Sequence, residues 1–186
     1  LGKSDEAFNE AQKMALLYGG CTPEHNVSLI SAKNVFHALN QSRYEVTPIL
    51  IDLHGCWYRM TEPPHEKQVA TNLKPLAIVP NRAGSSFIDQ NNGEILQFDV
   101  VFPLLHGVYG EDGTLQGLLE MLNLPYIGCN VLASAIGMDK YYTKRLLQQA
   151  GFKIANYLYF QDWQKDEIKY EEIITTLGSP VFIKPV

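Results

Sequence analysis

The chain has 186 residues, of which 46% are hydrophobic, and its 15 Lys and Arg against 20 Asp and Glu give a formal net charge of −5. This length suits one large domain or two small ones. The lack of any basic run in the sequence argues against nucleic acid or an anionic membrane as a partner. No apolar run approaches the roughly 20 residues of a membrane span. Three widely spaced cysteines without a CxxC pair are typical of reduced thiols, so a cytoplasmic protein is predicted.

Residues 13–52 alternate between strand and helix patterns. The apolar run 13–20 ends in two glycines and is typical of a buried strand, and 44–52 is strand-like again. Between them, helical spacing is kept by Leu29, Ala32, Phe36 and Leu39. A second apolar side predicts that this helix lies between two layers; it consists of Val27, Ile30 and Ala38. The β-α-β order predicts an α/β fold with a parallel sheet.

The segment 55–98 interrupts this alternation with short strand-like runs. The last two runs are joined at Asn92 and Gly93, a strong hairpin signal, so 55–98 is predicted to be an insertion of antiparallel strands. The earlier alternation returns with a strand at 99–107, a glycine-rich loop, a helix and a short strand at 124–128. The helix is marked by leucines at i, i+3, i+4 and i+7, which are Leu115, Leu118, Leu119 and Leu122.

The chain after residue 138 is predicted to begin a second unit. Asp139 is placed to cap a helix that runs to Ala150 and stops at Gly151. Two further apolar runs, 157–160 and 181–186, are strand-like, with a polar helix near 166–177 between them. Because nothing follows to pair with the last strand, this α+β unit is expected to be incomplete.

Three parts follow from these patterns. Residues 1–12 are expected to be a leader or an expression remnant, because they start without Met and lack the apolar core of a signal peptide. Residues 13–138 are predicted to form an N-terminal substrate-binding α/β domain that carries the 55–98 insertion. Residues 139–186 are expected to begin the second domain.

The turn after the first strand contains the first candidate site residue. Gly19 and Gly20 let the backbone approach a ligand closely or adopt positive φ, and the next helix points its N-terminal N–H groups into the same space. Glu24 stands there. Its carboxylate either caps the helix or meets the ammonium group of a substrate, and the sequence leaves both interpretations open.

A second candidate cluster follows the strand at 99–107. The loop LLHGVYGEDG (104–113) supplies His106 and Glu111 at the edge where open α/β sheets bind ligands. A structural histidine is the alternative for His106, although the flanking acids can orient its ring. His54, which occurs in a similar LHG triplet, lacks such neighbours and is predicted to be an exposed turn residue.

Two lysines complete the candidate set. Lys184 lies in an apolar strand-like run, where it loses hydration unless it meets a counter-charge such as a phosphate. A solvated edge position is the alternative. Lys140, which follows Asp139, reads by itself as a surface residue.

Three motifs, taken in order, resemble those of the D-alanine–D-alanine ligases of the ATP-grasp superfamily. They are LLYGGCTPEHNVSLISAKNV (16–35), the long run 99–147, and PVFIKP (180–185), and the resemblance extends from Lys13 to Val186. The central run is the specific one, with LHGxxGEDGxLQGxLE followed by LPYxG and SAxxMDK. The resemblance implies a Rossmann-like pre-ATP-grasp domain followed by the start of an α+β ATP-grasp domain.

The resemblance also implies residue roles. Glu24 resembles the acid that binds the amino group of the first D-alanine, and is therefore the candidate catalytic residue as well as a substrate ligand. His106 resembles the histidine beside that substrate, and Glu111 the acid that supports the same pocket. Lys140 and Lys184 resemble the two lysines that hold the ATP phosphates. One departure is an asparagine at position 26, where the family usually has an acid.

The implied activity is the ATP-dependent joining of two D-alanines into D-alanyl-D-alanine, through an acyl phosphate, for peptidoglycan precursors. D-alanine and ATP are the expected partners, and a cytoplasmic homodimer is expected. Mg²⁺ or Mn²⁺ is expected to be bound by residues beyond this chain, which itself has no predicted metal ligand. Ligases that make D-alanyl-D-lactate or D-alanyl-D-serine are alternatives, as is a fragment that only folds, dimerises and binds ligands in part. The 186-residue chain alone is expected to be inactive.

Overall fold

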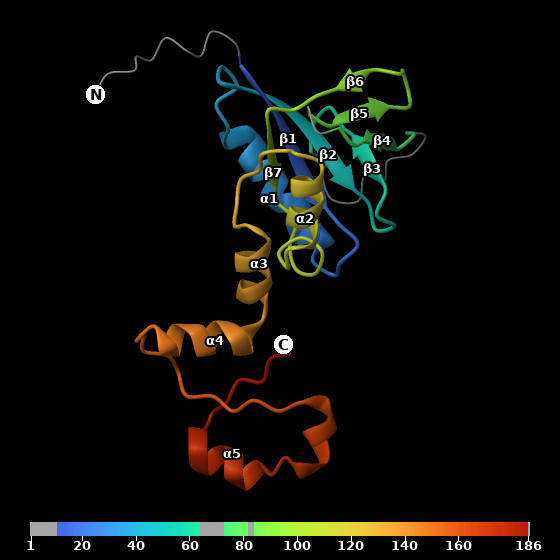
Figure 1. Cartoon of the computed structure of the whole chain (residues 1–186). Coiled ribbons are helices and arrows are strands. Elements are labelled where there is room, and N and C mark those ends of the chain that lie inside the picture. Colours follow the sequence, from blue (N-terminus) through green and yellow to red (C-terminus); the bar gives the residue numbers. More distant parts are fainter. Residues whose placement is uncertain (1–10, 64–72, 82–83, 186) are drawn as a thin grey trace, which may run out of the picture. The chain divides into compact units, whose positions relative to one another are not determined.

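A computed structural model describes residues 11–63, 73–81 and 84–185 (Figure 1). The chain divides after Ala135 into two compact units, called unit 1 and unit 2 below. Within the described ranges, no helix is both long enough and apolar enough to cross a membrane.

The main sheet of unit 1 has the strand order β3-β2-β1-β7. Its strands are β1 (Gln12–Gly19), β2 (Tyr44–Ile51), β3 (Trp57–Arg59) and β7 (Val100–Pro103). β1 runs parallel to both β2 and β7, and Leu17 pairs with Ile49 on one side and Pro103 on the other. This arrangement confirms the predicted β-α-β opening and parallel sheet. It also brings the carboxyl ends of β1 and β7 to the same edge.

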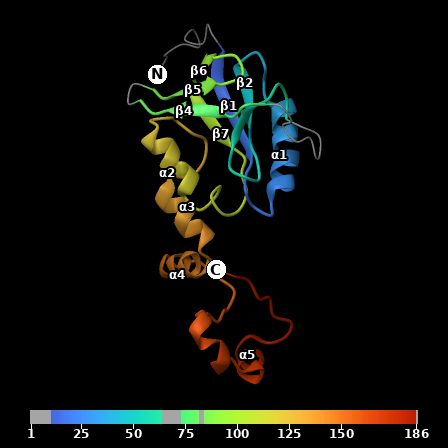
Figure 2. The ribbon, with the colours of Figure 1, turned by 90° about the vertical axis from the view of Figure 1, so that its right-hand side faces the viewer.

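Helices cover both faces of this sheet (Figure 2). On one face, α1 (His25–Ala38) buries Leu29 and Ala32 against β1 and β2. On the other face, α2 (Thr114–Met121) packs its buried leucines into a larger core that also contains Phe87. The prediction that α1 lies between two layers is wrong, because Val27 is 54% exposed and Ile30 is 49% exposed.

A three-stranded antiparallel sheet lies within the predicted insertion. It consists of β4 (Leu76–Val79), β5 (Ser86–Asp89) and β6 (Ile95–Leu96), in that order. The hairpin between β5 and β6 turns at Asn92 and Gly93, whose φ is 79°, as predicted. The first strand of the segment, β3, instead pairs antiparallel with β2 and extends the main sheet. The strand expected at 124–128 is reduced to one bridge, between Tyr126 and Val101.

Unit 2 is helical, and no described side chain in it is buried. α3 (Val131–Met138) begins in unit 1 and crosses the boundary; α4 (Lys140–Gln149), the 3₁₀ helix η2 (Asp162–Glu167) and α5 (Tyr170–Leu177) lie wholly in unit 2. Asp139 caps α4 by accepting the N–H groups of Tyr141 and Tyr142, both at 2.9 Å, and the helix ends before Gly151, as predicted.

The strands predicted at 157–160 and 181–186 are absent from the described part of unit 2. Both segments are extended coil, and Val186 itself lies outside the described residues. An apolar run becomes a strand only where another strand offers ladder partners, and the described residues of unit 2 provide none.

Candidate functional site

The turn after β1 depends on its two glycines for packing. Gly19 and Gly20 have φ values of 92° and 96°. A Cβ on Gly19 would collide with the carbonyl oxygen of Ile51, and one on Gly20 would lie 3.1 Å from the side chain of Leu105. Of the two predicted reasons for these glycines, positive φ is confirmed. The space beside them is filled by β2 and the loop after β7.

Glu24 occupies the N-cap position of α1, but its side chain makes no capping hydrogen bond. Its own N–H donates to Thr22 Oγ1 at 3.2 Å. The carboxylate instead reaches the loop after β7, where a Cβ added to Gly107 would collide with Glu24 Oε2. The capping interpretation therefore does not describe this side chain, which is exposed at the edge of the sheet.

The loop after β7 brings His106 and Glu111 to the same edge. Glu111 Oε2 accepts the N–H of Gly107 at 2.7 Å, and Glu111 Oε1 lies 3.9 Å from His106 Nδ1. Thr22 Oγ1 donates to the His106 carbonyl at 3.3 Å, which ties the two loops together. The structure thus gathers Glu24, His106 and Glu111, although 82 to 87 residues separate Glu24 from the other two in sequence.

The rest of this loop is braced by its own side chains. Asp112 accepts the N–H groups of Tyr109 and Thr114, at 2.9 and 3.0 Å. Burial alone would raise the pKa of Asp112, but these N–H donors stabilise the carboxylate and hold its pKa below the usual value. Gln116 Nε2 donates to the Gly110 carbonyl at 2.9 Å from a buried position in α2. The backbone that presents His106 and Glu111 is therefore fixed.

Two serines of α1 belong to the site but were missed in the sequence. Ser28 is fully buried; its hydroxyl accepts the N–H of Gly19 at 2.7 Å and donates to the carbonyl of Leu104 at 2.5 Å. Ser31 Oγ lies 3.1 Å from His106 Nε2. Together with Glu24 they are spaced i, i+4 and i+7, which places them on one face of the helix. This spacing of polar residues along the helix is the sequence pattern that could have predicted the two serines as neighbours of Glu24.

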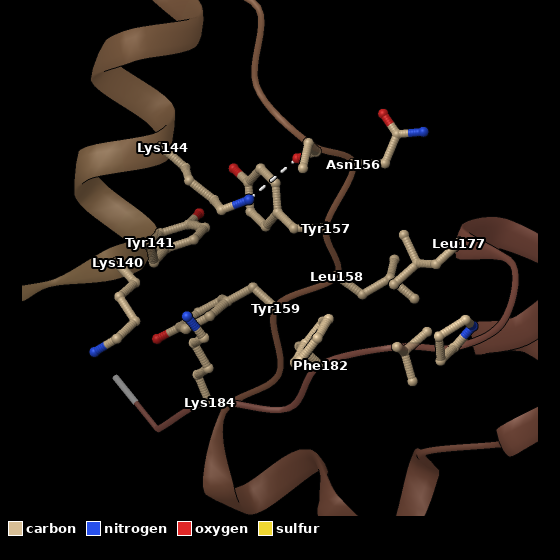
Figure 3. Close-up of a pocket in the computed structure, with 13 residues that line it drawn as sticks. Lys140, Tyr141, Lys144, Asn156, Tyr157, Leu158, Tyr159, Leu177, Phe182 and Lys184 are labelled. Atoms are coloured by element: carbon tan, nitrogen blue, oxygen red, sulfur yellow. Dashed lines mark hydrogen bonds between the residues drawn. The ribbon is translucent and has the colours of Figure 1, made fainter.

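The two predicted lysines line one pocket in unit 2, of about 470 Å³ (Figure 3). Lys140 comes from the first turn of α4 and Lys184 from the coil after α5. Both are exposed. The expectation that Lys184 sits in an apolar strand is wrong, and its ammonium group keeps contact with solvent. His54, as predicted, lies in an exposed turn.

Aromatic rings form one wall of this pocket. Tyr141 stacks on Tyr159 with ring centroids 4.0 Å apart. Lys144, one turn after Lys140, donates to the Ala155 carbonyl at 3.1 Å and lies 4.8 Å from the centre of the Tyr157 ring (Figure 3). Lys144 therefore lines the pocket in addition to the two lysines predicted as phosphate ligands, although the sequence was interpreted as placing it outside the site. Its one-turn spacing from Lys140 was the signal.

No group of three or more His, Cys, Asp or Glu side chains that could hold a metal ion occurs in the described ranges 11–63, 73–81 and 84–185. Glu24, His106 and Glu111 lie at one edge of the sheet in unit 1 but do not form such a group, and the pocket of unit 2 is lined mainly by lysines, tyrosines and apolar residues. The residues described here therefore do not fit a divalent cation, and no metal ligand is assigned to them.

Known proteins resemble this chain over most of its length. Residues 13–129 match the family model described as "D-ala D-ala ligase N-terminus". The chain is 46% identical over 185 residues to a D-alanine–D-alanine ligase of Geobacillus kaustophilus and 42% identical over 182 residues to one of Proteus mirabilis; each match covers 93% of this chain and 50% of the relative.

Solved structures give the same result. The D-alanine–D-alanine ligase of Coxiella burnetii superposes with a TM-score of 0.77 at 34% identity, over 89% of this chain and 49% of that one. VanG, a D-Ala:D-Ser ligase of Enterococcus faecalis, superposes with a TM-score of 0.71 at 33% identity, over 90% and 50% of the two chains. The chain thus spans about half the length of the relatives it matches. It belongs to the D-alanine–D-alanine ligase family.

Proposed function

We propose that this chain contributes the first-substrate site and the ATP-phosphate site of a ligase that joins two D-alanines for peptidoglycan precursors at the expense of ATP. The proposal rests mainly on one observation: in this member of the family, Glu24 lies beside the loop of His106 and Glu111 at the carboxyl edge of the sheet.

Glu24 is proposed to bind the ammonium group of the first D-alanine. Two features support this role. Its carboxylate makes no capping bond, so its oxygens are not committed to the helix. It also lies beside the loop that carries Glu111, so a cationic group there would meet two negative charges, which favours an ammonium group over an anion.

Lys140 and Lys184 are proposed to bind the phosphates of ATP. They line the same pocket, so an anion bound there would meet two positive charges. Both remain exposed, so neither has lost its hydration before the nucleotide arrives. The tyrosine wall of the pocket adds flat apolar surface next to the lysines.

The proposed reaction has two steps. A carboxylate oxygen of the first D-alanine attacks the γ-phosphorus of ATP; the bond to the β,γ-bridging oxygen breaks, and ADP leaves with the acyl phosphate formed. The amine of the second D-alanine then attacks the acyl carbon, the C–N bond forms, inorganic phosphate leaves with the C–O electron pair, and the amine loses a proton. Positioning and charge stabilisation by protein groups are the main contributions expected in such phosphoryl transfer.

The setting of this activity is also part of the proposal. By resemblance to the family, the enzyme works as a cytoplasmic homodimer, and Mg²⁺ or Mn²⁺ serves the ATP reaction through residues other than those described here. The chemistry that such an ion supplies is neutralisation of charge on the phosphates.

Calorimetric titration of the 186-residue chain with D-alanine tests the substrate site. Glu24→Gln removes the charge while keeping the shape, and a lost hydrogen bond to a charged group costs about 1.5–3 kcal/mol. We expect the Kd for D-alanine to rise at least about tenfold. Glu45→Gln, an exposed acid on β2, is the matched control and is expected to leave the Kd unchanged. Equal Kd values for Glu24→Gln and the unsubstituted chain would contradict the assignment.

Turnover is tested in a chimera in which residues 1–186 replace the matching half of the Geobacillus kaustophilus relative. We expect D-alanine-dependent phosphate release that Glu24→Gln abolishes or strongly lowers. A chimera that folds and hydrolyses ATP without any dependence on D-alanine would overturn the proposed activity.

A D-alanyl-D-serine ligase is the second candidate, because VanG superposes with a TM-score of 0.71. Both reactions start from activation of a D-alanine carboxylate. The Glu24 experiment therefore tests the step that the two candidates share.

A further inference from the structure

We propose that Ser31 is a positioning residue that fixes the ring of His106 with its hydrogen on Nε2. Ser31 Oγ lies 3.1 Å from His106 Nε2, and its hydroxyl donates to the carbonyl of Val27 at 3.0 Å. A serine hydroxyl has a single hydrogen. The Val27 carbonyl can only accept; when the hydroxyl hydrogen serves it, the serine oxygen accepts from the imidazole and Nε2 is the donor.

The other ring nitrogen faces Glu111. Its carboxylate oxygen lies 3.9 Å from Nδ1, beyond hydrogen-bond distance, and the second oxygen already accepts the N–H of Gly107 at 2.7 Å. Glu111 alone would favour a hydrogen on Nδ1. The neutral ring has only one N–H hydrogen. Because the contact of Nε2 with Ser31 is the closer one, it determines the tautomer: the hydrogen is on Nε2 and Nδ1 keeps its lone pair. In the protonated ring both nitrogens carry hydrogens and both contacts are satisfied.

Two further hydrogen bonds to the backbone of the His106 loop keep the Ser31–His106 contact in place. Ser28 bonds the Leu104 carbonyl at 2.5 Å, two residues before His106, and Thr22 bonds the carbonyl of His106 itself at 3.3 Å. The loop cannot slide along α1 without breaking these bonds. The His106 side chain is 30% exposed, so water does not fully compete for the Ser31 contact.

A consequence for the ligand rests on the proposed function. With Nε2 engaged by Ser31, the nitrogen left for a ligand is Nδ1, which in the neutral ring is an acceptor. An acceptor between Glu24 and Glu111 suits the N–H groups of a substrate ammonium, whereas a donor there would repel them.

The experiment is imidazole ¹⁵N NMR on the labelled chain without ligand, at about pH 8.5, well above the usual histidine pKa of about 6.5. We expect His106 to carry its hydrogen on Nε2. His25 is the internal control with the opposite tautomer, because its Nδ1 lies 2.7 Å from the carbonyl of Gly20, which can only accept. Ser31→Ala is expected to shift His106 to a mixture or to the Nδ1 form and to leave His25 unchanged.

A matched pair guards against a folding defect. Ser31→Thr and Ser31→Val have the same shape and differ only in the hydroxyl, so Thr is expected to keep the Nε2 form and Val to lose it. The proposal is overturned if His106 carries its hydrogen on Nδ1 in the unsubstituted chain, or if Thr and Val give the same tautomer. Since no ligand is present, this result is independent of whether Glu24→Gln changes D-alanine binding, and the two proposals can fail separately.

Discussion

Replacing Ser28 by Ala tests how firmly the two loops of the candidate site are joined. The hydroxyl is fully buried and serves the N–H of Gly19 and the carbonyl of Leu104 at 2.7 and 2.5 Å. Ser28→Ala leaves both backbone groups without this partner, and each unsatisfied buried group costs about 1–3 kcal/mol. Because the turn can relax in part, we expect the free energy of unfolding of unit 1 to fall by about 2–4 kcal/mol.

Urea denaturation followed by tryptophan fluorescence measures this loss. The chain has two tryptophans. Trp57 stacks on Phe87 at 6.1 Å and packs against the core of unit 1, whereas Trp163 is 72% exposed. A Trp163→Phe background therefore leaves a signal that reports unit 1.

The matched control is Ser42→Ala, because the hydroxyl of Ser42 is exposed and donates to a neighbouring side chain, Asn40 Oδ1, at 2.6 Å. Its effect is expected to stay within about 0.5 kcal/mol. A loss below about 1 kcal/mol for Ser28→Ala, equal to that of the control, would refute the reasoning that the two buried groups depend on this hydroxyl.

Three other predictions concern the nucleotide site, a loop and a turn. In the Geobacillus chimera, Lys184→Ala is expected to lower kcat/KM for ATP by about 10²-fold or more. Lys153 is also exposed, and Lys153→Ala serves as the control that should change kcat/KM less than twofold. Equal effects of the two substitutions would contradict the assignment of Lys184 to the ATP phosphates. Because the folded pKa of Asp112 is lowered, its stabilisation is present above the unfolded pKa of about 3.9 and is lost as the pH falls through the folded value. Asp112→Asn should therefore lower the melting temperature at pH 7, and the difference in melting temperature from the unsubstituted chain should shrink as the pH falls below about 4. Gly19→Ala is expected to destabilise more than Gly93→Ala in the same melts: both glycines have positive φ, but only at Gly19 would a Cβ collide with a main-chain carbonyl.

Local patterns predicted the elements of unit 1 well. The apolar runs and glycines around β1 and β2 and the Asn92-Gly93 turn, like the capping Asp139 in unit 2, each carry a signal within a few residues, and each was confirmed. Hydrophobic periodicity does not say what covers an apolar side. Val27 was therefore predicted to be buried although it is exposed, since folded proteins leave many apolar atoms at their surface.

The site was predicted only in part, for a related reason. Glu24 and His106 stand beside glycines at strand ends, where the chain itself marks an unusual turn. Ser31 has no such mark, because its partner His106 is 75 residues away and only the parallel pairing of β1 with β7 brings them together. The run 157–160 shows the opposite error: it has the composition of a strand, but no described neighbour pairs with it.

The spacing of Glu24, Ser28 and Ser31 along α1 restricts how this segment can change length. An insertion or deletion of one residue between the first and last of them would rotate one end of the helix by about 100° relative to the other. Either the carboxylate or the Ser31 hydroxyl would then leave the loop that carries His106. Closing a longer loop costs little, by contrast. Among homologous sequences, length differences are therefore expected in the connections outside 24–31, while variation within that stretch takes the form of substitutions alone.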